Sequence, residues 1–323
     1  MGYGNWSDQS YDYISKSRAS APVDRIFTNV AAADPAMNSV GIKLRESRDS
    51  ADHPESNAIA VFFDVTGSMG DVPELFARSK LGGLMKLIVS RNYIADPQIL
   101  FGAIGDATCD RYPLQIGQFE SSLEMDTWLT KIFLEGGGGG QIKESYGLAH
   151  HFAGNYTALD CFEKRTRKGY LFTMGDEKPW PNMPAAEINQ VFGGSKISQA
   201  VSIEDAVKQA SRMYHVFHIV IGGHTSHGDD PQVLAAWRKL LGERALHLAE
   251  PEGVCELIAT TIGSMEGRDW DDMASDLAAN GTSTAIVKAV GHAVQSAGTS
   301  IARVARASGK LPTAPSAKRG IRL

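Results

Sequence analysis

Apolar and polar residues alternate in blocks along the central part of the chain, and the blocks have the lengths of strands and helices. Strand-like apolar runs occur at 58–65, 98–107, 113–120, 168–177, 215–223 and 245–250. Most of the segments between them carry apolar residues at the spacing of one helix face. This succession is typical of an α/β domain with a mostly parallel sheet.

Helix signals fall between the strand signals, with one exception that shapes the sheet. Helices are predicted at 73–91, 123–134, 144–154, 202–214, 231–243 and 253–265. The runs at 98–107 and 113–120 lie too close together for a helical crossover, so they form an antiparallel hairpin at one edge. The predicted fold is Rossmann-like and doubly wound, with a six-stranded, mostly parallel sheet that has one antiparallel edge strand.

Both ends of the chain differ from this central part. Residues 1–56 are rich in Ser, Asp, Asn and Ala and are expected to drape over the core as an extension of the domain at 57–265. In 266–323, apolar positions 286, 290, 293, 297 and 304 predict a C-terminal helix that packs on the same chain. A basic, flexible tail follows, with Lys310, Lys318, Arg319 and Arg322.

Composition narrows the class of protein. The chain has 323 residues, 43% of them hydrophobic, with a net charge of −5 and a pI near 6.0. A globular core is therefore expected, and general nucleic-acid binding is not. Three widely spaced cysteines indicate neither a disulfide framework nor a zinc knuckle. We find no run of about eighteen apolar residues and expect a cytoplasmic protein without a membrane span.

Small oxygen-bearing side chains follow the first apolar strand. The stretch AVFFDVTGSMG places Asp64, Thr66 and Ser68 at alternate positions of a strand-to-helix turn. Asp176 ends a later buried strand in TMGDE, and carboxyl ends of parallel strands share one edge of a sheet. Hard oxygen donors of this kind suit Mg²⁺ or Mn²⁺. The sequence therefore predicts a divalent-cation site at this edge.

DVTGSM resembles the D-x-S/T-x-S signature of von Willebrand factor A (vWA) domains, in which the metal-ion-dependent adhesion site (MIDAS) occupies this turn. The resemblance covers roughly residues 57–265 and includes the edge hairpin and TMGDE. It implies that Asp64, Thr66 and Ser68 bind the metal directly or through water, and that Asp176 is the acid of the third loop. It also implies that a partner protein completes the metal shell with an Asp or Glu.

One position departs from the family pattern. Gln141 and Ile142 stand about where the second loop of the family supplies a Thr. Asp106, Glu144 or Ser145 could replace that ligand. A coordinated Glu144 would satisfy the metal internally and make the ion more structural.

Plainer interpretations exist for each motif. DVTGSM could be a capped turn with Thr66 or Ser68 as the N-cap, and Asp176 could be an acid at a helix start. Asp106 and Asp110 fit ordinary hairpin-turn acids. His224, His227 and Asp229 could hold a second metal but more simply form a polar loop. The GGGGG run at 136–140 is expected to be a flexible loop, because no phosphate-binding motif surrounds it.

Two functions from different classes fit these motifs. The first is a non-enzymatic, divalent-metal-dependent protein-binding module, an intracellular adaptor or scaffold. The resemblance to bacterial proteins of this kind implies a MoxR-type AAA+ ATPase as a possible partner. The alternative is a Mg²⁺-dependent phosphatase of the haloacid dehalogenase type, in which the first Asp is the nucleophile. Such enzymes need a second acid two residues later, where this chain has Thr66.

Overall fold

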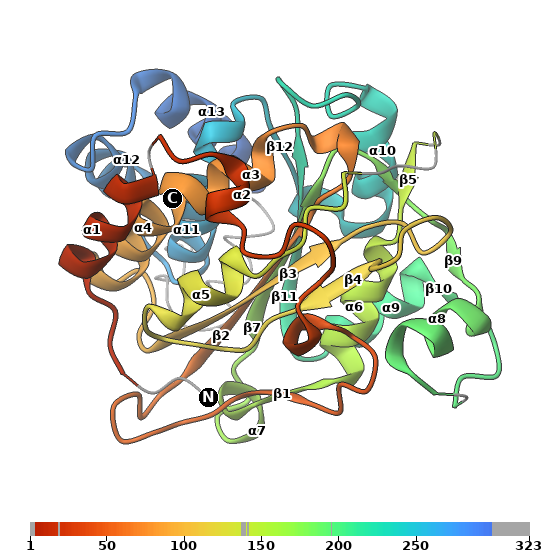
Figure 1. The fold of residues 1–323 in the computed structure, drawn as a ribbon. Coiled ribbons are helices and arrows are strands. Elements are labelled where there is room, and N and C mark those ends of the chain that lie inside the picture. The colour runs from red at the N-terminus through yellow and green to blue at the C-terminus, as the bar shows by residue number, and fades with distance from the viewer. Residues whose placement is uncertain (1–3, 19, 137–139, 141, 195, 299–323) are drawn as a thin grey trace, which may run out of the picture.

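The computed structural model describes residues 4–18, 20–136, 140, 142–194 and 196–298. Its centre is a six-stranded sheet in the order β12-β11-β7-β2-β3-β4, mixed α/β with all neighbours parallel except β3 and β4 (Figure 1). The strands are β2 (Asn57–Asp64), β3 (Pro97–Ile104), β4 (Leu114–Ile116), β7 (Gly169–Gly175), β11 (Tyr214–Ile221) and β12 (Ala245–Leu248). Each lies within a predicted strand or within one residue of it, and the antiparallel edge hairpin is confirmed.

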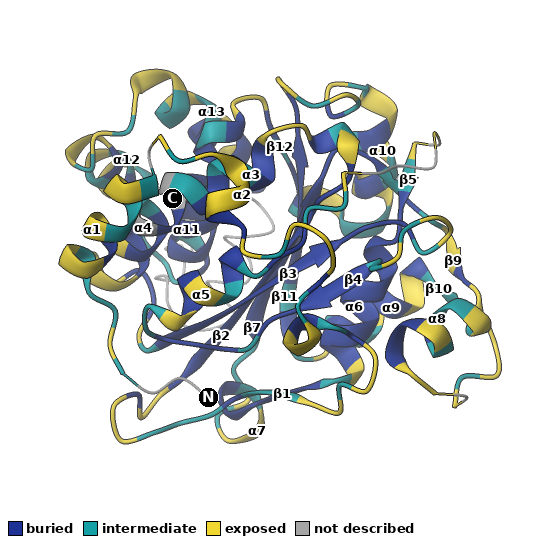
Figure 2. Ribbon diagram, viewed as in Figure 1, coloured by how far each residue is buried: buried dark blue, intermediate teal, exposed yellow. Residues whose placement is uncertain are grey.

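Helices cover both faces of the sheet, so its central strands are buried on both sides (Figure 2). One face packs on the helical segment Val72–Ser90 and on helices α5 (Glu124–Thr130), α11 (Val254–Met265) and α13 (Thr284–Ser296). The other face packs on α6 (Tyr146–Asn155), α8 (Ala185–Phe192), α9 (Ile203–Ala210) and α10 (Pro231–Leu241). The carboxyl ends of the parallel strands share one edge of this sheet.

The helical segment at 72–90 is not a regular α-helix. It consists of α3 (Val72–Leu75), a π-helical turn at Phe76–Lys80, α4 (Leu81–Met85) and a second π-helical turn at Lys86–Ser90. The predicted helix at 202–214 begins as expected, because the hydroxyl of Ser202 accepts a hydrogen bond of 3.0 Å from the backbone N–H of Asp205.

The described N-terminal residues contact helices and a short strand of the rest of the chain. Helix α1 (Asp8–Arg18) contacts α4, and Arg18 forms a bidentate ion pair of 2.6 and 2.7 Å with Asp126 of α5. Strand β1 (Arg45–Ser47) pairs with β6 (Thr157–Leu159), and short helix α2 (Val23–Ile26) buries Ile26. Short helix α7 (Asp160–Glu163) follows β6. The domain limits at 56 and 265 stay a prediction.

The C-terminal part has two helices, where the sequence predicts one. Helix α12 (Trp270–Ala279) precedes α13, and Asp269 accepts a 2.8 Å hydrogen bond from the N–H of Asp271 at its start. Val290, Ala293 and Ala297 of the predicted stripe are buried against the core. Position 304 and the basic tail lie outside the described residues.

Three two-stranded ladders lie outside the main sheet, and one of them matters for the site. Strand β5 (Lys143–Glu144) pairs with β8 (Lys178–Pro179) in parallel, whereas the sequence placed residue 144 in a helix. The β1–β6 pair is the second ladder. Strands β9 (Asn182–Met183) and β10 (Val201–Ser202) form the third. Among the described helices, none is long and apolar enough to cross a membrane.

Candidate metal centre

The turn after β2 brings three predicted side chains into one hydrogen-bonded group. Asp64 Oδ1 accepts hydrogen bonds from the Thr66 backbone N–H at 2.8 Å and from the Thr66 hydroxyl at 2.6 Å. Thr66 Oγ1 lies 3.1 Å from Ser68 Oγ. The hydroxyls thus point to each other and to a carboxylate. Neither is hydrogen-bonded to a helix N–H as an N-cap would be.

Asp176 joins this group from the end of β7. Its Oδ1 accepts a 2.8 Å hydrogen bond from the Ser68 hydroxyl, and its Oδ2 accepts one of 3.0 Å from the backbone N–H of His227. The next element is the strand β8, so Asp176 is not an acid at a helix start. The structure therefore places the four predicted residues Asp64, Thr66, Ser68 and Asp176 together, as their positions at strand ends led us to expect.

With Asp64 and Asp176 both ionised, the hydroxyl protons are too few for the contacts. Thr66 and Ser68 carry one hydroxyl proton each. When Asp64 and Asp176 are ionised, both protons are used in hydrogen bonds to these acids. The 3.1 Å contact between the two hydroxyl oxygens then contains no proton and sets lone pairs against each other. A cation beside both oxygens would turn this repulsion into coordination.

Two buried glutamates line the same cavity as the hydroxyls of Thr66 and Ser68. The cavity has a volume of about 690 Å³, and its described lining is Thr66, Gly67, Ser68, Gly136, Gly140, Ile142, Glu144, Glu177, Ser226 and His227. Glu144 and Glu177 are 2% and 4% exposed. Glu144 is one of the three additional ligands suggested by the sequence, whereas the sequence motifs do not single out Glu177, which directly follows Asp176.

The charges of these acids disfavour one another. Burial raises the pKa of Asp64, and the charge of Asp176 adds to the effect. Burial also raises the pKa of Glu144, with further contributions from Asp64 and Glu177. The pKa of Glu177 rises to about 8, first through burial and then through Asp64 and Asp176. A bound cation would reverse this effect, because it favours the ionised forms.

The other two proposed additional ligands are used elsewhere. Asp106 accepts hydrogen bonds from the N–H and hydroxyl of Thr108 and from the Trp180 indole, and its own N–H donates to Asp110. This favours the interpretation of Asp106 and Asp110 as turn acids. The hydroxyl of Ser145 accepts a 2.9 Å hydrogen bond from the N–H of Ala107. Neither Asp106 nor Ser145 lines the described part of the cavity.

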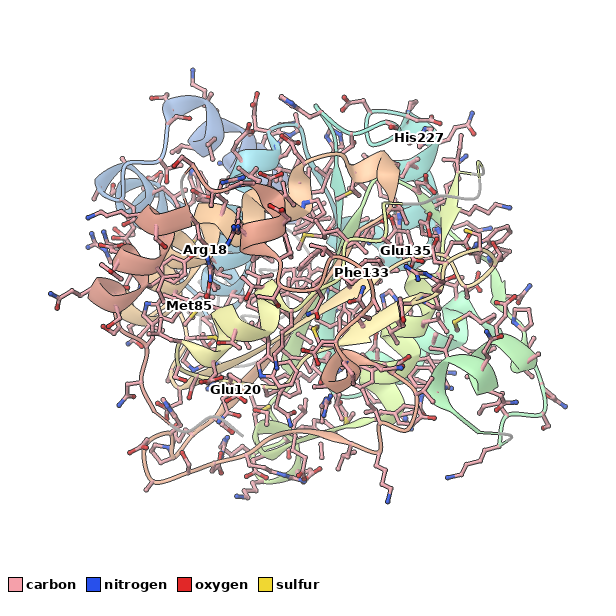
Figure 3. The ribbon with its side chains drawn as sticks, in the orientation of Figure 1. Arg18, Met85, Glu120, Phe133, Glu135 and His227 are labelled. Atoms are coloured by element: carbon pink, nitrogen blue, oxygen red, sulfur yellow. The ribbon has the colours of Figure 1, made fainter. Side chains whose placement is uncertain are left out.

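The loop after β11 lines the cavity, and its contacts differ from those of a second metal site. The N–H of Ser226 donates to the carbonyl of Ser68 at 3.0 Å, and His227 lies on this loop before α10 (Figure 3). Asp229 accepts a hydrogen bond from the N–H of Gly223 and lies 3.3 Å from His247 Nε2. These contacts are those of a polar loop. Among the described residues, no three His, Cys, Asp or Glu side chains stand together as a metal-ligand set.

Tyr146 is a further member of the site that the sequence did not reveal. Its hydroxyl donates a 2.8 Å hydrogen bond to Asp64 Oδ2, so both oxygens of Asp64 are occupied. The Tyr146 ring packs edge-on against His218 and Trp237. Trp237 in turn donates to the carbonyl of Glu177 at 3.0 Å. Tyr146 and Asp64 are 82 residues apart in the sequence, so no local pattern predicts their contact.

The histidines behind Tyr146 are buried and predict a pH effect on stability. Burial lowers the pKa of His150 to about 4 and also lowers that of His218. The unfolded chain therefore binds more protons below about pH 6.5, and stability falls as the pH drops from there toward 4. As the pH falls through this window, the free energy of unfolding of wild type should drop by about 1.4 kcal/mol per pH unit more than that of His150→Phe. Denaturant titrations in metal-free buffer measure it; parallel pH curves for the two proteins would contradict the assignment.

The comparisons with known proteins identify no family. The sequence matches no protein-family model and no curated protein. Among solved structures, the pilus adhesin SpaC from Lactobacillus rhamnosus GG in its open conformation is similar at 8% identity and a TM-score of 0.45. The match covers 68% of this chain and 31% of the adhesin, so the chain spans about a third of that protein.

A second structure of the same adhesin gives 9% identity and a TM-score of 0.44, over 68% of this chain and 32% of the adhesin. Proximal thread matrix protein 1 from the mussel byssus gives 12% identity and a TM-score of 0.40, over 70% of this chain and 47% of that protein.

Proposed function

We propose that the chain is a vWA-like, divalent-metal-dependent protein-binding module whose site holds Mg²⁺ or Mn²⁺. The observation that carries the proposal is the hydroxyl pair of Thr66 and Ser68, which is backed by two acids and faces a cavity. A hydroxyl that donates its proton to a carboxylate presents lone pairs to the other side. The donor set is made of hard oxygen atoms, which suits these two ions.

Two of the residues would contact the ion, and the others would position them. Thr66 and Ser68 line the cavity and would contact the ion, while Asp64 and Asp176 lie behind them and would act through the hydroxyls or through water. A divalent ion held there supplies an electrophilic point for an oxygen ligand. Tyr146 and the N–H of His227 orient the two acids. In this proposal a partner protein supplies an Asp or Glu as the remaining ligand.

A phosphatase is less well supported by the same contacts. A nucleophilic Asp needs one carboxylate oxygen free to attack phosphorus. Both oxygens of Asp64 accept hydrogen bonds, and its exposure is 0%. Thr66 donates to Asp64 where the enzyme would have its second acid. We therefore propose a binding role without catalysis.

An intracellular adaptor or scaffold that works with a MoxR-type AAA+ ATPase is the proposed setting, and metal dependence tests it. Binding of the full chain to a purified ATPase of this type should be strong in Mg²⁺, lost in EDTA and lost in Asp64→Asn. The amide can still accept from Thr66 and donate to Tyr146, so the fold should persist. Asp271→Ala, at an exposed acid in the first turn of α12, is the control and should bind normally. Binding that persists in EDTA would contradict the proposal.

A further inference from the structure

Glu144 and Glu177 are brought together by the small β5–β8 ladder. Glu144 pairs with Pro179 in this ladder, and Glu177 directly precedes β8. The N–H of Trp180 donates to the carbonyl of Glu144 at 3.2 Å and fixes the pair of strands. Both glutamates line the cavity that also contains the hydroxyls of Thr66 and Ser68.

Each glutamate has one buried oxygen without a hydrogen-bond partner among the described residues. These oxygens are Glu144 Oε2 and Glu177 Oε2. Burying a polar atom without a partner is unfavourable, and more so for a charged group. Both side chains are more than nine-tenths buried and reach the cavity wall, so the missing partner is expected on the cavity side.

The two neighbouring lysines are engaged elsewhere. Lys143 Nζ lies 4.6 Å from the centre of the Trp180 ring, and Lys178 Nζ donates to Gln232 at 3.0 Å. His227 Nε2 approaches Glu177 Oε1 at 3.8 Å, too far for a hydrogen bond. Within the described part of the chain, no ion pair is formed by Glu144.

One divalent ion at the hydroxyl pair leaves these glutamates uncompensated. Its two positive charges offset Asp64 and Asp176, which are hydrogen-bonded to the hydroxyls. The unpartnered oxygens of Glu144 and Glu177 then remain without a cation, on the face where the partner's acid would approach. Carboxylate oxygens of two buried side chains and of a partner's acid repel one another when no cation lies between them.

We propose that Glu144 and Glu177 bind a second divalent cation in the same cavity, beside the ion at Thr66 and Ser68. The inference rests on the proposed function and deepens it, because the second ion offsets the charges that would repel the partner's acid. Carboxylate oxygens are ligands for Mg²⁺ and Mn²⁺, and the cavity of about 690 Å³ has room for two ions with water. By holding this ion, the glutamates allow an acidic side chain of the partner to approach the cavity.

The number of Mn²⁺ ions per chain tests this inference. Equilibrium dialysis with metal analysis should find two ions bound to the metal-stripped full chain. The double variant Glu144→Gln, Glu177→Gln should bind one. Electron paramagnetic resonance should show spin coupling between neighbouring Mn²⁺ ions in wild type and none in the variant. Glu124→Gln with Glu204→Gln, two exposed helix-start acids, is the matched control and should keep two ions.

Three results would overturn the second site. One is a single ion in wild type that the glutamine variant retains with equal affinity. Another is a single ion that the variant binds more weakly, which would mean that the glutamates and hydroxyls share it. The third is two ions in both proteins. Binding of no ion by wild type would instead defeat the proposed function itself. Thermal unfolding in EDTA checks the fold, and the variant should be at least as stable as wild type because it lacks the two buried acids whose oxygens have no partner.

Discussion

Replacing Thr66 by Val and Ser68 by Ala is expected to weaken divalent-metal binding at the hydroxyl pair by at least about a hundredfold, or about 3 kcal/mol. The two substitutions delete the oxygens that face the cavity, while Asp64 and Asp176 stay in place. Val preserves the branched shape of Thr in the extended backbone at position 66. The Mg²⁺ affinity of the double variant, measured by calorimetry, checks this.

The chain contains a matched control for the Thr66 substitution. Asp106 and Thr108 repeat the Asp-x-Thr turn at the end of the next strand, with N–H and hydroxyl contacts of 2.9 and 2.8 Å. Thr108 does not line the described part of the cavity. Thr108→Val should therefore leave the metal affinity within about threefold of wild type, since small surface changes are worth under ~0.5 kcal/mol. Equal losses in both variants would assign the effect to the turns and not to coordination.

Gly175→Ala is expected to lower the free energy of unfolding by about 2–3 kcal/mol and to weaken metal binding as well. A Cβ at position 175 would lie 1.9 Å from the Tyr146 hydroxyl oxygen. Tyr146 would have to move and release Asp64, which its hydroxyl now holds at 2.8 Å. Neither neighbour can give way easily, because β7 is buried and the Tyr146 ring packs edge-on against the stacked rings of His218 and Trp237. Denaturant unfolding and metal titration of the variant measure the two effects.

Two further variants separate this clash from the general cost of a methyl group. Gly83→Ala lies in α4 and meets nothing within 4 Å, so it should stabilise the protein by about 0.5–1 kcal/mol through helix propensity. Tyr146→Phe in the Gly175→Ala background removes the contacted oxygen and should recover part of the lost stability. Equal effects of alanine at 83 and 175 would refute the role given to Gly175.

The sheet and the four central site residues could be predicted because both depend on local pattern. Central strands such as β2 are buried along their whole length and therefore read as continuous apolar runs. The parallel arrangement then places the residues at the carboxyl ends of β2 and β7 at one edge, and this predicts that Asp64 and Asp176 lie together. The short loop between β3 and β4 likewise fixed their antiparallel pairing.

The remaining features depend on contacts that are distant in sequence. Glu144 belongs to a strand only because β8 lies beside it, so its helix-like surroundings misled the prediction. Tyr146 reaches Asp64 from the first turn of α6, and its role depends on the absence of a side chain at Gly175. Helix α12 buries only Met273 and Leu277, which is too few apolar residues for a clear periodic signal.

Calorimetric titration of the metal-stripped full chain with MgCl₂ and MnCl₂ tests the central claim most directly. The account predicts saturable binding of both ions in wild type, and loss of the binding at the hydroxyl pair when Thr66 and Ser68 are replaced by Val and Ala. Absence of any heat of binding with either ion, confirmed by metal analysis after dialysis, would contradict it.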